Sequence, residues 1–370
     1  MCIGWLKKLC HWGPLTALGI IHTITIMTIH CSRQLPRESY LDTAISTSFF
    51  VLCLTTLYYF LNAIIEGPGY LDPKWMPEKA IDVQYLQYCI VCQGYKAPRS
   101  HHCRRCNRCV LKMDHHCPWI NTCVGHRNHG HFATFLATAV AGSWFSSVIL
   151  ISWTATVLSV KPLPFPPPSL ITLILVMFSI GLAIGVQLAL GMLLYFQILA
   201  IVRNRTEIEG WILEKARYRR GNTDNKYVHP YSKGWLFNVK QVITLDCTPV
   251  GDGITWPVID GCDQYTLTRE QLAQKLDKRK RARNYRIIKS ASGARCPIGH
   301  GFGVFCHPRC SDEPHIKLDV GDIVTVTRWK QYWLFGEKDQ KGNAQSKRVR
   351  GWFPRPCAIE VIEGDLKSHK

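Results

Sequence analysis

Negative charge is scarce in this sequence, and charge of either sign is missing over long stretches. The 370 residues include 26 Asp and Glu against 45 Lys and Arg, which gives a formal net charge of +19. Four segments contain no charged residue at all: 14–31, 45–65, 132–157 and 170–202. Such segments, with an apolar content of 47%, exclude an intrinsically disordered chain, a collagen, a simple coiled coil and an ordinary soluble enzyme.

The four uncharged segments predict four transmembrane helices. A helix needs about 20 apolar residues to cross the hydrocarbon core of a bilayer, and segment 45–65 would reach about 31 Å. A buried core helix of a soluble protein is the alternative for each segment, and the first is diluted by His22, His30 and several Thr. Residues 162–168 are rich in proline and predict a short, stiff loop between the third and fourth spans.

The distribution of basic residues predicts the orientation of the spans. Lys and Arg are numerous between the second and third spans, whereas Lys161 is alone between the third and fourth. The positive-inside rule therefore places the N-terminus, the segment between spans two and three and the C-terminal part in the cytosol. No small-residue cleavage site follows a short apolar core near the N-terminus, so we expect no cleaved signal peptide. The basic excess fits an anionic membrane leaflet better than nucleic acid, because the basic residues flank apolar spans.

Cysteine is concentrated in one window. Seven of the 17 cysteines lie between residues 89 and 123, and they share the window with many histidines. Cys-x-x-Cys pairs mixed with His predict zinc in a reducing compartment, since zinc takes four S or N ligands in a tetrahedron. Two sites need eight ligands. Eight candidates are present: Cys89, Cys92, His102, Cys103, Cys106, Cys109, His116 and Cys123. One cysteine, Cys117, is left over.

The remaining cysteine predicts nucleophilic chemistry. An imidazole within reach can accept the proton of a thiol, and a carboxylate behind the imidazole fixes its tautomer and stabilises the imidazolium. Asp114, His115 and Cys117 supply these three groups within four residues. The alternative is that Cys117 is a redundant metal ligand or a small core residue.

The window resembles the DHHC family of protein S-acyltransferases. The spacing C-x2-C-x9-H-C-x2-C-x2-C-x4-D-H-H-C-x5-C-x4-N-x3-F is present in full and ends at Asn128 and Phe132. The resemblance implies that Cys117 takes the acyl group from palmitoyl-CoA, that His115 is the general base and that Asp114 orients it. It also implies two structural zinc ions, one held by Cys89, Cys92, His102 and Cys109, the other by Cys103, Cys106, His116 and Cys123.

Four further residues are expected at the acyl donor. By resemblance, Lys96, Arg99 and His101 face the coenzyme, and Trp119 lies at the interface beside the thioester. Solvated surface cations are the alternative for the three basic residues. Other family motifs are partial: 66–69 reads EGPG where Asp-Pro-Gly is common, and 204–209 reads NRTEIE where the family has Asn-x-Thr-Thr-x-Glu. Asn238 resembles a family Asn that packs against the active-site domain.

The C-terminal third has a different pattern. A basic run at 275–286 predicts either a solvated linker or a patch that faces the leaflet. Beyond it, alternating strands and the aromatic residues at 332–333 and 352–353 resemble an SH3 barrel. The usual groove tyrosines are missing and Cys357 replaces one of them, so we expect no binding of PxxP peptides. Cys296, Cys306, Cys310 and Cys357 are candidates for small core residues or for acylation sites.

The predicted fold is an α-helical membrane protein with four transmembrane helices, a cytosolic zinc-bound cysteine-rich domain and a small C-terminal SH3-like β-barrel. We divide the chain into an N-terminal segment with two spans (1–68), a catalytic zinc-binding domain (84–134), two further spans (132–202), a cytosolic linker with the basic run (203–284) and the SH3-like domain (285–362). The arrangement resembles DHHC enzymes of the endoplasmic reticulum membrane that carry a C-terminal SH3 domain.

The predicted activity is transfer of palmitate through acyl-Cys117 to cysteines of membrane-associated proteins. The rival prediction is a non-catalytic or ubiquitin-ligase-like zinc scaffold on a membrane. RING domains also bind two zinc ions, but they need no additional cysteine beside Asp-His and do not lie between spans.

Overall fold

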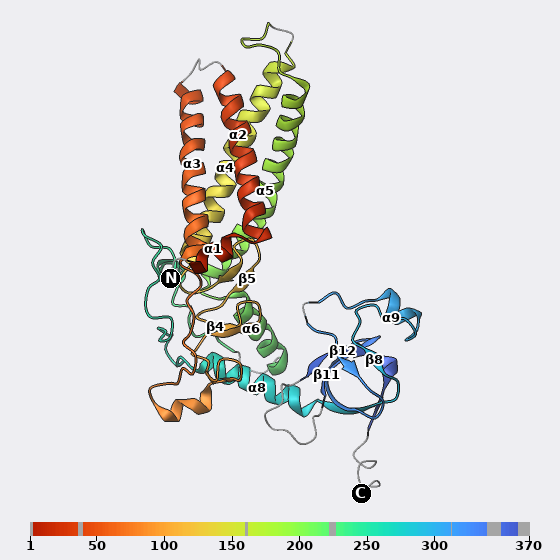
Figure 1. Cartoon of the computed structure of the whole chain (residues 1–370). Coiled ribbons are helices and arrows are strands. Elements are labelled where there is room, and N and C mark those ends of the chain that lie inside the picture. Colours follow the sequence, from red (N-terminus) through yellow and green to blue (C-terminus); the bar gives the residue numbers. More distant parts are fainter. Residues whose placement is uncertain are drawn as a thin grey trace. The chain divides into compact units, whose positions relative to one another are not determined.

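The computed structural model describes residues 3–35, 40–159, 162–221, 227–311, 313–338 and 349–361. Figure 1 shows the whole chain. It divides into two compact units, residues 1–272 and residues 273–370. Two positions used in the sequence analysis lie outside the described residues: Lys161, between the third and fourth spans, and residue 362, at the end of the SH3-like domain.

Four long apolar helices form a bundle in the first unit (Figure 1). They are α2 (Trp12–Gln34), α3 (Tyr40–Ile65), α4 (His129–Val157) and α5 (Leu170–Val202), preceded by the short α1 (Ile3–Leu9). Each is long and apolar enough to cross a membrane. The predicted four-span fold is confirmed, and this chain is a multi-pass membrane protein.

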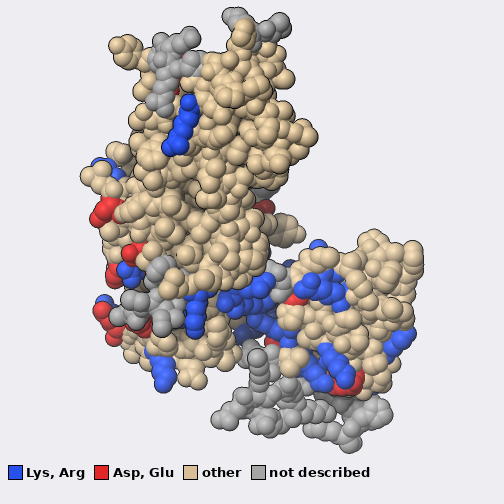
Figure 2. All heavy atoms as spheres, turned by 45° about the horizontal axis from the view of Figure 1, so that its top comes forward, with Lys and Arg blue, Asp and Glu red and all other residues tan. Residues whose placement is uncertain are grey.

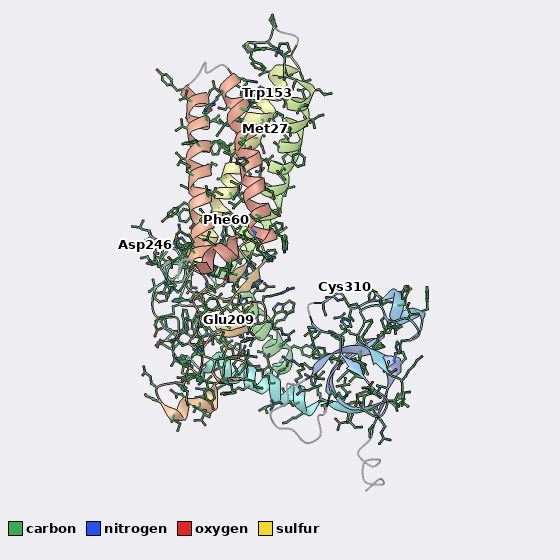
Figure 3. All side chains as sticks on the ribbon, in the orientation of Figure 1. Met27, Phe60, Trp153, Glu209, Asp246 and Cys310 are labelled. Carbon is green, nitrogen blue, oxygen red and sulfur yellow. The ribbon has the colours of Figure 1, made fainter. Side chains whose placement is uncertain are left out.

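Helix α4 lies at the centre of the bundle. It packs along α3, α5 and α2, and its buried face includes small residues such as Gly142, Ser143 and Ser146 that allow close approach. The hydroxyls of Thr28 in α2 and Ser146 share a buried hydrogen bond of 2.7 Å. Apolar side chains fill the rest of the bundle, from Trp153 and Met27 at one end to Phe60 at the other (Figure 3).

Charged side chains are scarce on the helical bundle of this unit. On the face shown in Figure 2, the bundle carries very few Lys, Arg, Asp or Glu side chains, and charged residues gather where the cysteine-rich window lies. This is the pattern expected when an apolar bundle is surrounded by lipid and its charged end by water.

Three short hairpins make up the cysteine-rich window. β1 (Tyr88–Cys89) pairs with β2 (Gly94–Tyr95), β3 (His101–Cys103) with β4 (Arg108–Val110), and β5 (His115–Cys117) with β6 (Thr122–Val124). A single 3-10 turn, η1 (Ala80–Tyr85), precedes them among the described residues. The last strand leads through Asn128 directly into α4, so the third hairpin is fixed to the bundle.

Residues after α5 fold back onto the hairpins. The segment predicted as a linker forms α6 (Glu207–Arg220), α7 (Trp235–Lys240) and α8 (Thr266–Lys280). Helix α6 begins with a capping box of Thr206 and Glu209. An apolar cluster that includes Leu213, Tyr231 and Trp256 gives this region its own core, so it is not an extended linker.

The second unit is a small β-barrel of the predicted SH3-like kind. Its five-stranded antiparallel sheet has the order β12-β11-β10-β7-β13, and β8 pairs with β9. The elements are β7 (Arg283–Ile287), β8 (Ala291–Ser292), α9 (Phe302–Cys306), β9 (Lys317–Leu318), β10 (Ile323–Trp329), β11 (Trp333–Lys338), β12 (Arg350–Pro354), η2 (Arg355–Cys357) and β13 (Ala358–Glu360). Cys357 is buried in its core, whereas Cys296, Cys306 and Cys310 are exposed.

Two tryptophans of the barrel are covered by the barrel's own chain. Trp333 and Trp352 are each 1% exposed. Trp333 Nε1 donates to the carbonyl of His307 at 2.8 Å, and Trp352 Nε1 donates to Glu313 Oε2 at 2.9 Å. Val304 of α9 packs with both tryptophans. Residues of the segment between β8 and β9 therefore cover both tryptophans.

Candidate functional site

Two clusters of metal-type ligands lie in the hairpins. Each holds three cysteines and one histidine: Cys89, Cys92, His102 and Cys109 in the first, and Cys103, Cys106, His116 and Cys123 in the second. The distances from His102 Nδ1 to the three sulfurs are 3.5, 3.4 and 3.9 Å, and those from His116 Nδ1 are 3.6, 3.4 and 3.6 Å. Zn–S and Zn–N bonds of about 2.3 and 2.0 Å put tetrahedral S and N ligands roughly 3.5 Å apart, so both clusters fit zinc.

Each cluster joins two consecutive hairpins. In the first, the Cys-x-x-Cys turn of hairpin β1–β2 meets His102 and Cys109, which face each other across hairpin β3–β4. In the second, the Cys-x-x-Cys turn of β3–β4 meets His116 and Cys123 across hairpin β5–β6. The three hairpins are therefore linked one after another.

The third hairpin repeats the second but lacks one cysteine. Residues 101–110 read HHCRRCNRCV and residues 115–124 read HHCPWINTCV. Both turns place an Asn in the left-handed region, Asn107 with φ 53° and Asn121 with φ 47°. Ile120 stands where the second hairpin has Cys106, and it is fully buried among apolar side chains. This internal repeat, which we did not use as a sequence signal, explains why Cys117 belongs to neither cluster.

Strand alternation separates His116, a member of the second cluster, from its neighbours His115 and Cys117. His115, His116 and Cys117 form β5, in which successive side chains point to opposite faces. His116 therefore faces the second cluster, while His115 and Cys117 share the other face. His115 interacts with the Cys117 thiol, and its Nδ1 lies 2.8 Å from Asp114 Oδ2.

Asp114 is held by three hydrogen bonds. Its Oδ2 accepts from His115 Nδ1 at 2.8 Å and from Gln197 Nε2 at 3.0 Å, and its Oδ1 accepts from the backbone N–H of Glu207 at 2.8 Å. Gln197 belongs to α5 and Glu207 begins α6, so residues far apart in the sequence fix this carboxylate. Sequence reasoning found neither partner.

The environment favours a charged Asp114 and His115. Burial would raise the pKa of Asp114, but its hydrogen bonds and the neighbouring histidines hold that pKa well below its usual value. Burial also disfavours the imidazolium, yet the hydrogen bonds to Asp114 and Cys117 raise the pKa of His115 to about 10.

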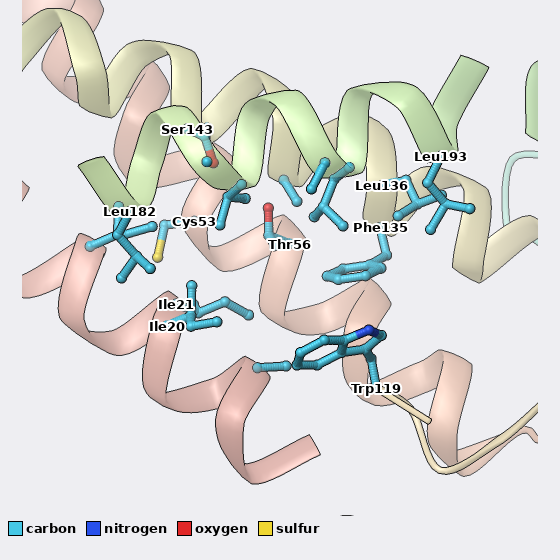
Figure 4. A pocket seen from close by; sticks show the side chains of 18 of the residues that line it. Ile20, Ile21, Cys53, Thr56, Trp119, Phe135, Leu136, Ser143, Leu182 and Leu193 are labelled. Carbon is cyan, nitrogen blue, oxygen red and sulfur yellow. The ribbon is translucent and has the colours of Figure 1, made fainter. Parts of the chain in front are cut away.

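Cys117 lines an apolar cavity inside the bundle. Figure 4 shows this cavity, with Trp119 and Leu193 toward one end and Leu182 toward the other. The cavity has a volume of about 370 Å³. Trp119 and Ile120 line it beside Cys117, and the rest of its wall comes from α2, α3, α4 and α5. Along α5 the lining runs from Leu193 to Gly181, about 18 Å at 1.5 Å per residue. The wall is almost entirely apolar, with Thr25, Cys53, Thr56 and Ser143 as its weakly polar members.

The start of α2 fits closely against hairpin β5–β6. A Cβ on Gly13 would lie 2.0 Å from the carbonyl oxygen of Pro118, so only glycine allows this contact. The rings of Trp12 and Trp119 meet edge to face at 5.6 Å, and both are largely exposed. Two tryptophans therefore stand beside Cys117 where the bundle meets the hairpins, a usual place for Trp at a membrane interface.

The predicted coenzyme contacts separate into two groups. Lys96 and His101 are half-buried. Arg99 is 2% exposed, and its guanidinium donates to both carboxylate oxygens of Glu209, at 2.6 and 2.8 Å, and to Asn204. It also lies between the rings of Tyr231 and Trp256. Arg99 is thus engaged within the protein, where it holds α6 against the hairpins rather than facing a ligand.

Asn238 of α7 ties the end of α5 to the same region. Its side-chain amide donates to the carbonyl of Val202 at 2.8 Å and to Ser232 Oγ at 3.0 Å. Asn204, Asn238 and Glu209 (the last labelled in Figure 3) form a buried polar frame where α5 ends and α6 begins. The partial motif 204–209 indicated this frame, but its partner Arg99 was not foreseen.

Comparison with known proteins identifies the family of this chain. Residues 82–214 match the family model of the DHHC palmitoyltransferases. The chain is 43% identical to the palmitoyltransferase ZDHHC6 of Mus musculus, over 97% of this chain and 94% of that protein, and 43% identical to ZDHHC6 of Homo sapiens over 98% and 94%. It is 33% identical to the probable protein S-acyltransferase 16 of Arabidopsis thaliana, over 61% of this chain and 81% of that protein. This membrane protein, with its paired Cys3His clusters, belongs to the DHHC family of palmitoyltransferases.

Proposed function

We propose that this palmitoyltransferase works through a thioester on Cys117. The observation that carries the proposal is the position of Cys117: it is the cysteine of the window that belongs to neither cluster, it shares a strand face with His115, and it lines the apolar cavity. A reactive sulfur at the end of an apolar cavity is the arrangement that transfer of a fatty acyl group requires.

The reaction has two balanced steps. In the first, the Cys117 sulfur attacks the thioester carbonyl of palmitoyl-CoA; a C–S bond to Cys117 forms, the bond to the coenzyme breaks, and the proton held by His115 goes to the departing coenzyme thiolate. In the second, a substrate thiol gives its proton to His115 and attacks the acyl-enzyme. The C–S bond to Cys117 breaks, the palmitoylated substrate leaves, and Cys117 is again a thiolate beside the imidazolium of His115.

The acyl chain is assigned to the cavity. An extended 16-carbon chain is about 19 Å long from ordinary C–C geometry, close to the length of the α5 lining. Burial of fourteen methylenes contributes on the order of 11 kcal/mol at about 0.8 kcal/mol each. Lys96 and His101 are the proposed contacts for the coenzyme phosphates, and Trp119 for the region of the thioester. Arg99 is not retained among these contacts because its donors are used by Glu209 and Asn204.

The two clusters are proposed to hold structural zinc. All four positions of each tetrahedron are filled by side chains, so a bound zinc would have no open position for substrate. Bound zinc would neutralise the thiolates and keep the three hairpins in register; the chemistry stays with Asp114, His115 and Cys117.

We propose further that the enzyme lies in the endoplasmic reticulum membrane, with both termini and the hairpins in the cytosol. Its substrates would be membrane-associated proteins with cytosolic cysteines. The basic residues between α3 and α4 support this orientation.

Labelling with alkynyl palmitoyl-CoA tests the proposal. We expect a hydroxylamine-labile label on Cys117, and none in Cys117→Ser, with zinc near two ions per chain in both proteins. Replacement of Cys103 should instead cause loss of metal and misfolding of the hairpins, and the variant should be inactive for that reason. A zinc-loaded, folded enzyme without label on Cys117 would contradict the thioester mechanism and favour a scaffold.

A further inference from the structure

We infer that Gln197 of α5 is a positioning residue for the triad, and that His129 at the start of α4 sets the direction of its amide. The inference rests on the proposed roles of Asp114, His115 and Cys117. Gln197 is 5% exposed and His129 is 4% exposed, so the two side chains meet out of water.

The donors and acceptors fix this arrangement. The NH₂ group of Gln197 donates to Asp114 Oδ2 at 3.0 Å, and the same oxygen lies 2.8 Å from His115 Nδ1. The Gln197 Oε1 then faces His129 Nε2 at 2.8 Å and needs a donor there. His129 meets this need with hydrogen on Nε2. A row of hydrogen bonds thus runs from His129 through Gln197 to Asp114 and on to His115.

The choice of glutamine follows from its place in the fold. Gln197 lies one helical turn from Leu193, which lines the cavity, and it is within a span. A Lys or Arg at this position would bring a second cation beside His115 and carry charge into the apolar bundle, which is costly. An amide supplies one N–H to the carboxylate without net charge.

The consequence is control of the direction in which Asp114 points. The Gln197 and His115 donors share Oδ2, and the Glu207 N–H holds Oδ1, so the carboxylate cannot rotate without breaking a hydrogen bond. Without Gln197, Asp114 Oδ2 loses one of its two hydrogen-bond donors. The His115 imidazole, which faces Cys117, then loses its fixed orientation. Because α5 also forms the wall of the cavity, the helix that contacts the acyl chain is the helix that positions the acid of the triad.

The test compares variants of the full-length enzyme in detergent or nanodiscs. Gln197→Leu keeps the size but removes both polar groups. Since a hydrogen bond to a charged group is worth a factor of roughly ten to a hundred, we expect kcat for acyl-Cys117 formation to fall by that factor with KM for palmitoyl-CoA unchanged. Gln197→Glu, of equal size but without a donor, should be at least as slow. Gln187→Leu, the same change elsewhere on α5, is the matched control and should keep wild-type rates.

Rescue and coupling separate positioning from a packing role. His129→Leu should slow acylation several-fold, whereas His129→Gln, which retains an N–H, should restore it. In the Asp114→Ala background, Gln197→Leu should have no further effect on the rate at which iodoacetamide alkylates Cys117, a reaction that needs no turnover. Normal kcat in zinc-loaded Gln197→Leu, or equal slowing of alkylation with and without Asp114, would overturn the inference. Label that persists in Cys117→Ser would instead overturn the thioester mechanism, so the two failures are distinguishable.

Discussion

At the scale of single residues, Ile120 decides what Cys117 can do. In the second hairpin, Cys103 and Cys106 together supply half a metal site. In the third, Ile120 fills the position of the second cysteine and packs in the apolar cluster with Cys117 and Phe132. One thiolate without its neighbour is a poor chelator, so Cys117 remains available for chemistry.

Ile120→Cys should therefore convert the nucleophile into part of a chelator. We expect micromolar Zn²⁺ to inhibit this variant and a chelator of low affinity to restore it, because two thiolates in a Cys-x-x-Cys turn bind zinc together. Ile120→Val, which costs about 0.5–1.5 kcal/mol of stability, is the control and should be insensitive to the same Zn²⁺. Acylation rates with and without added metal measure the difference, and equal sensitivity in both variants would count against this role of Ile120.

The pH profile of acylation should depend on His115. With its pKa raised to about 10, His115 is protonated beside the sulfur at neutral pH, and the wild-type rate should stay level until the pH approaches that value. In His115→Ala the thiolate forms only as a cysteine ordinarily ionises, near about 8.5, so a low rate at neutral pH should rise with pH. Single-turnover labelling between pH 6 and 9 measures this. A defect of constant size across the range would mean that His115 has a structural role.

The same shift has a consequence for folding. Because the folded pKa lies above the ordinary value of 6.5, the stabilisation is complete below that value and is lost as the pH rises through about 10. Unfolding midpoints of the wild type and of His115→Ala should therefore converge at high pH.

Residue-level interpretation was simplest where the residues concerned are close together in the sequence. Spacing identified the eight metal-type ligands and left Cys117 over beside Asp114 and His115. The division of the ligands into two sets came from the family resemblance, and the two clusters of the structure have that division. Gln197 and Glu209 escaped because their partners, Asp114 and Arg99, lie far away in the chain. Arg99 was expected at the coenzyme because the sequence around an arginine does not show that a distant carboxylate, here Glu209, will be buried against it.

At the scale of elements, α6 connects the end of α5 to the triad. Its first turn offers the N–H of Glu207 to Asp114, and its third residue, Glu209, binds Arg99 of the hairpin region. Burial would raise the pKa of Glu209, but Arg99 keeps it below its usual value, so the pair is ionised. The helix is thus held at its N-terminus by the residues it helps to position.

Arg99→Leu should destabilise the folded enzyme rather than weaken coenzyme binding. Removing one member of a buried ion pair costs about 3–5 kcal/mol because the other charge is left unpaired. We expect a lower unfolding midpoint and little change in KM for palmitoyl-CoA in the folded fraction. Arg99→Leu/Glu209→Leu should regain part of the lost stability. A raised KM with an unchanged midpoint would restore Arg99 to the coenzyme contacts.

Prediction of elements was good where composition changes sharply and weaker where it does not. The uncharged segments gave the four spans, although the helices extend beyond them, as α2 does from Trp12 to Gln34. The segment after α5 has ordinary polar composition, and its core is built from scattered residues such as Tyr231 and Trp256. No periodic pattern marks that core, so a linker was the natural expectation.

At the scale of the whole molecule, the second unit is a barrel whose tryptophans are covered by its own chain. We expect no saturable binding of PxxP peptides tighter than about 100 μM, or roughly 5.5 kcal/mol. Uncovering Trp333 would break its hydrogen bond to His307 and move Val304 out of the aromatic cluster. Titration of the full-length enzyme with a peptide panel, followed by tryptophan fluorescence, measures this. Micromolar binding would show that the covering segment opens.

The one-after-another linkage of the hairpins makes the enzyme unequally sensitive to damage. The second cluster holds the reactive hairpin directly through His116 and Cys123, while the first acts only on the hairpin before it. An oxidant or a chelator that removes zinc from the first cluster should leave an enzyme with reduced activity. Removal of zinc from the second cluster should abolish activity at once. In a cell under oxidative stress, acyl transfer would therefore decline in two stages. Loss of the second cluster would set the point at which lipid modification stops.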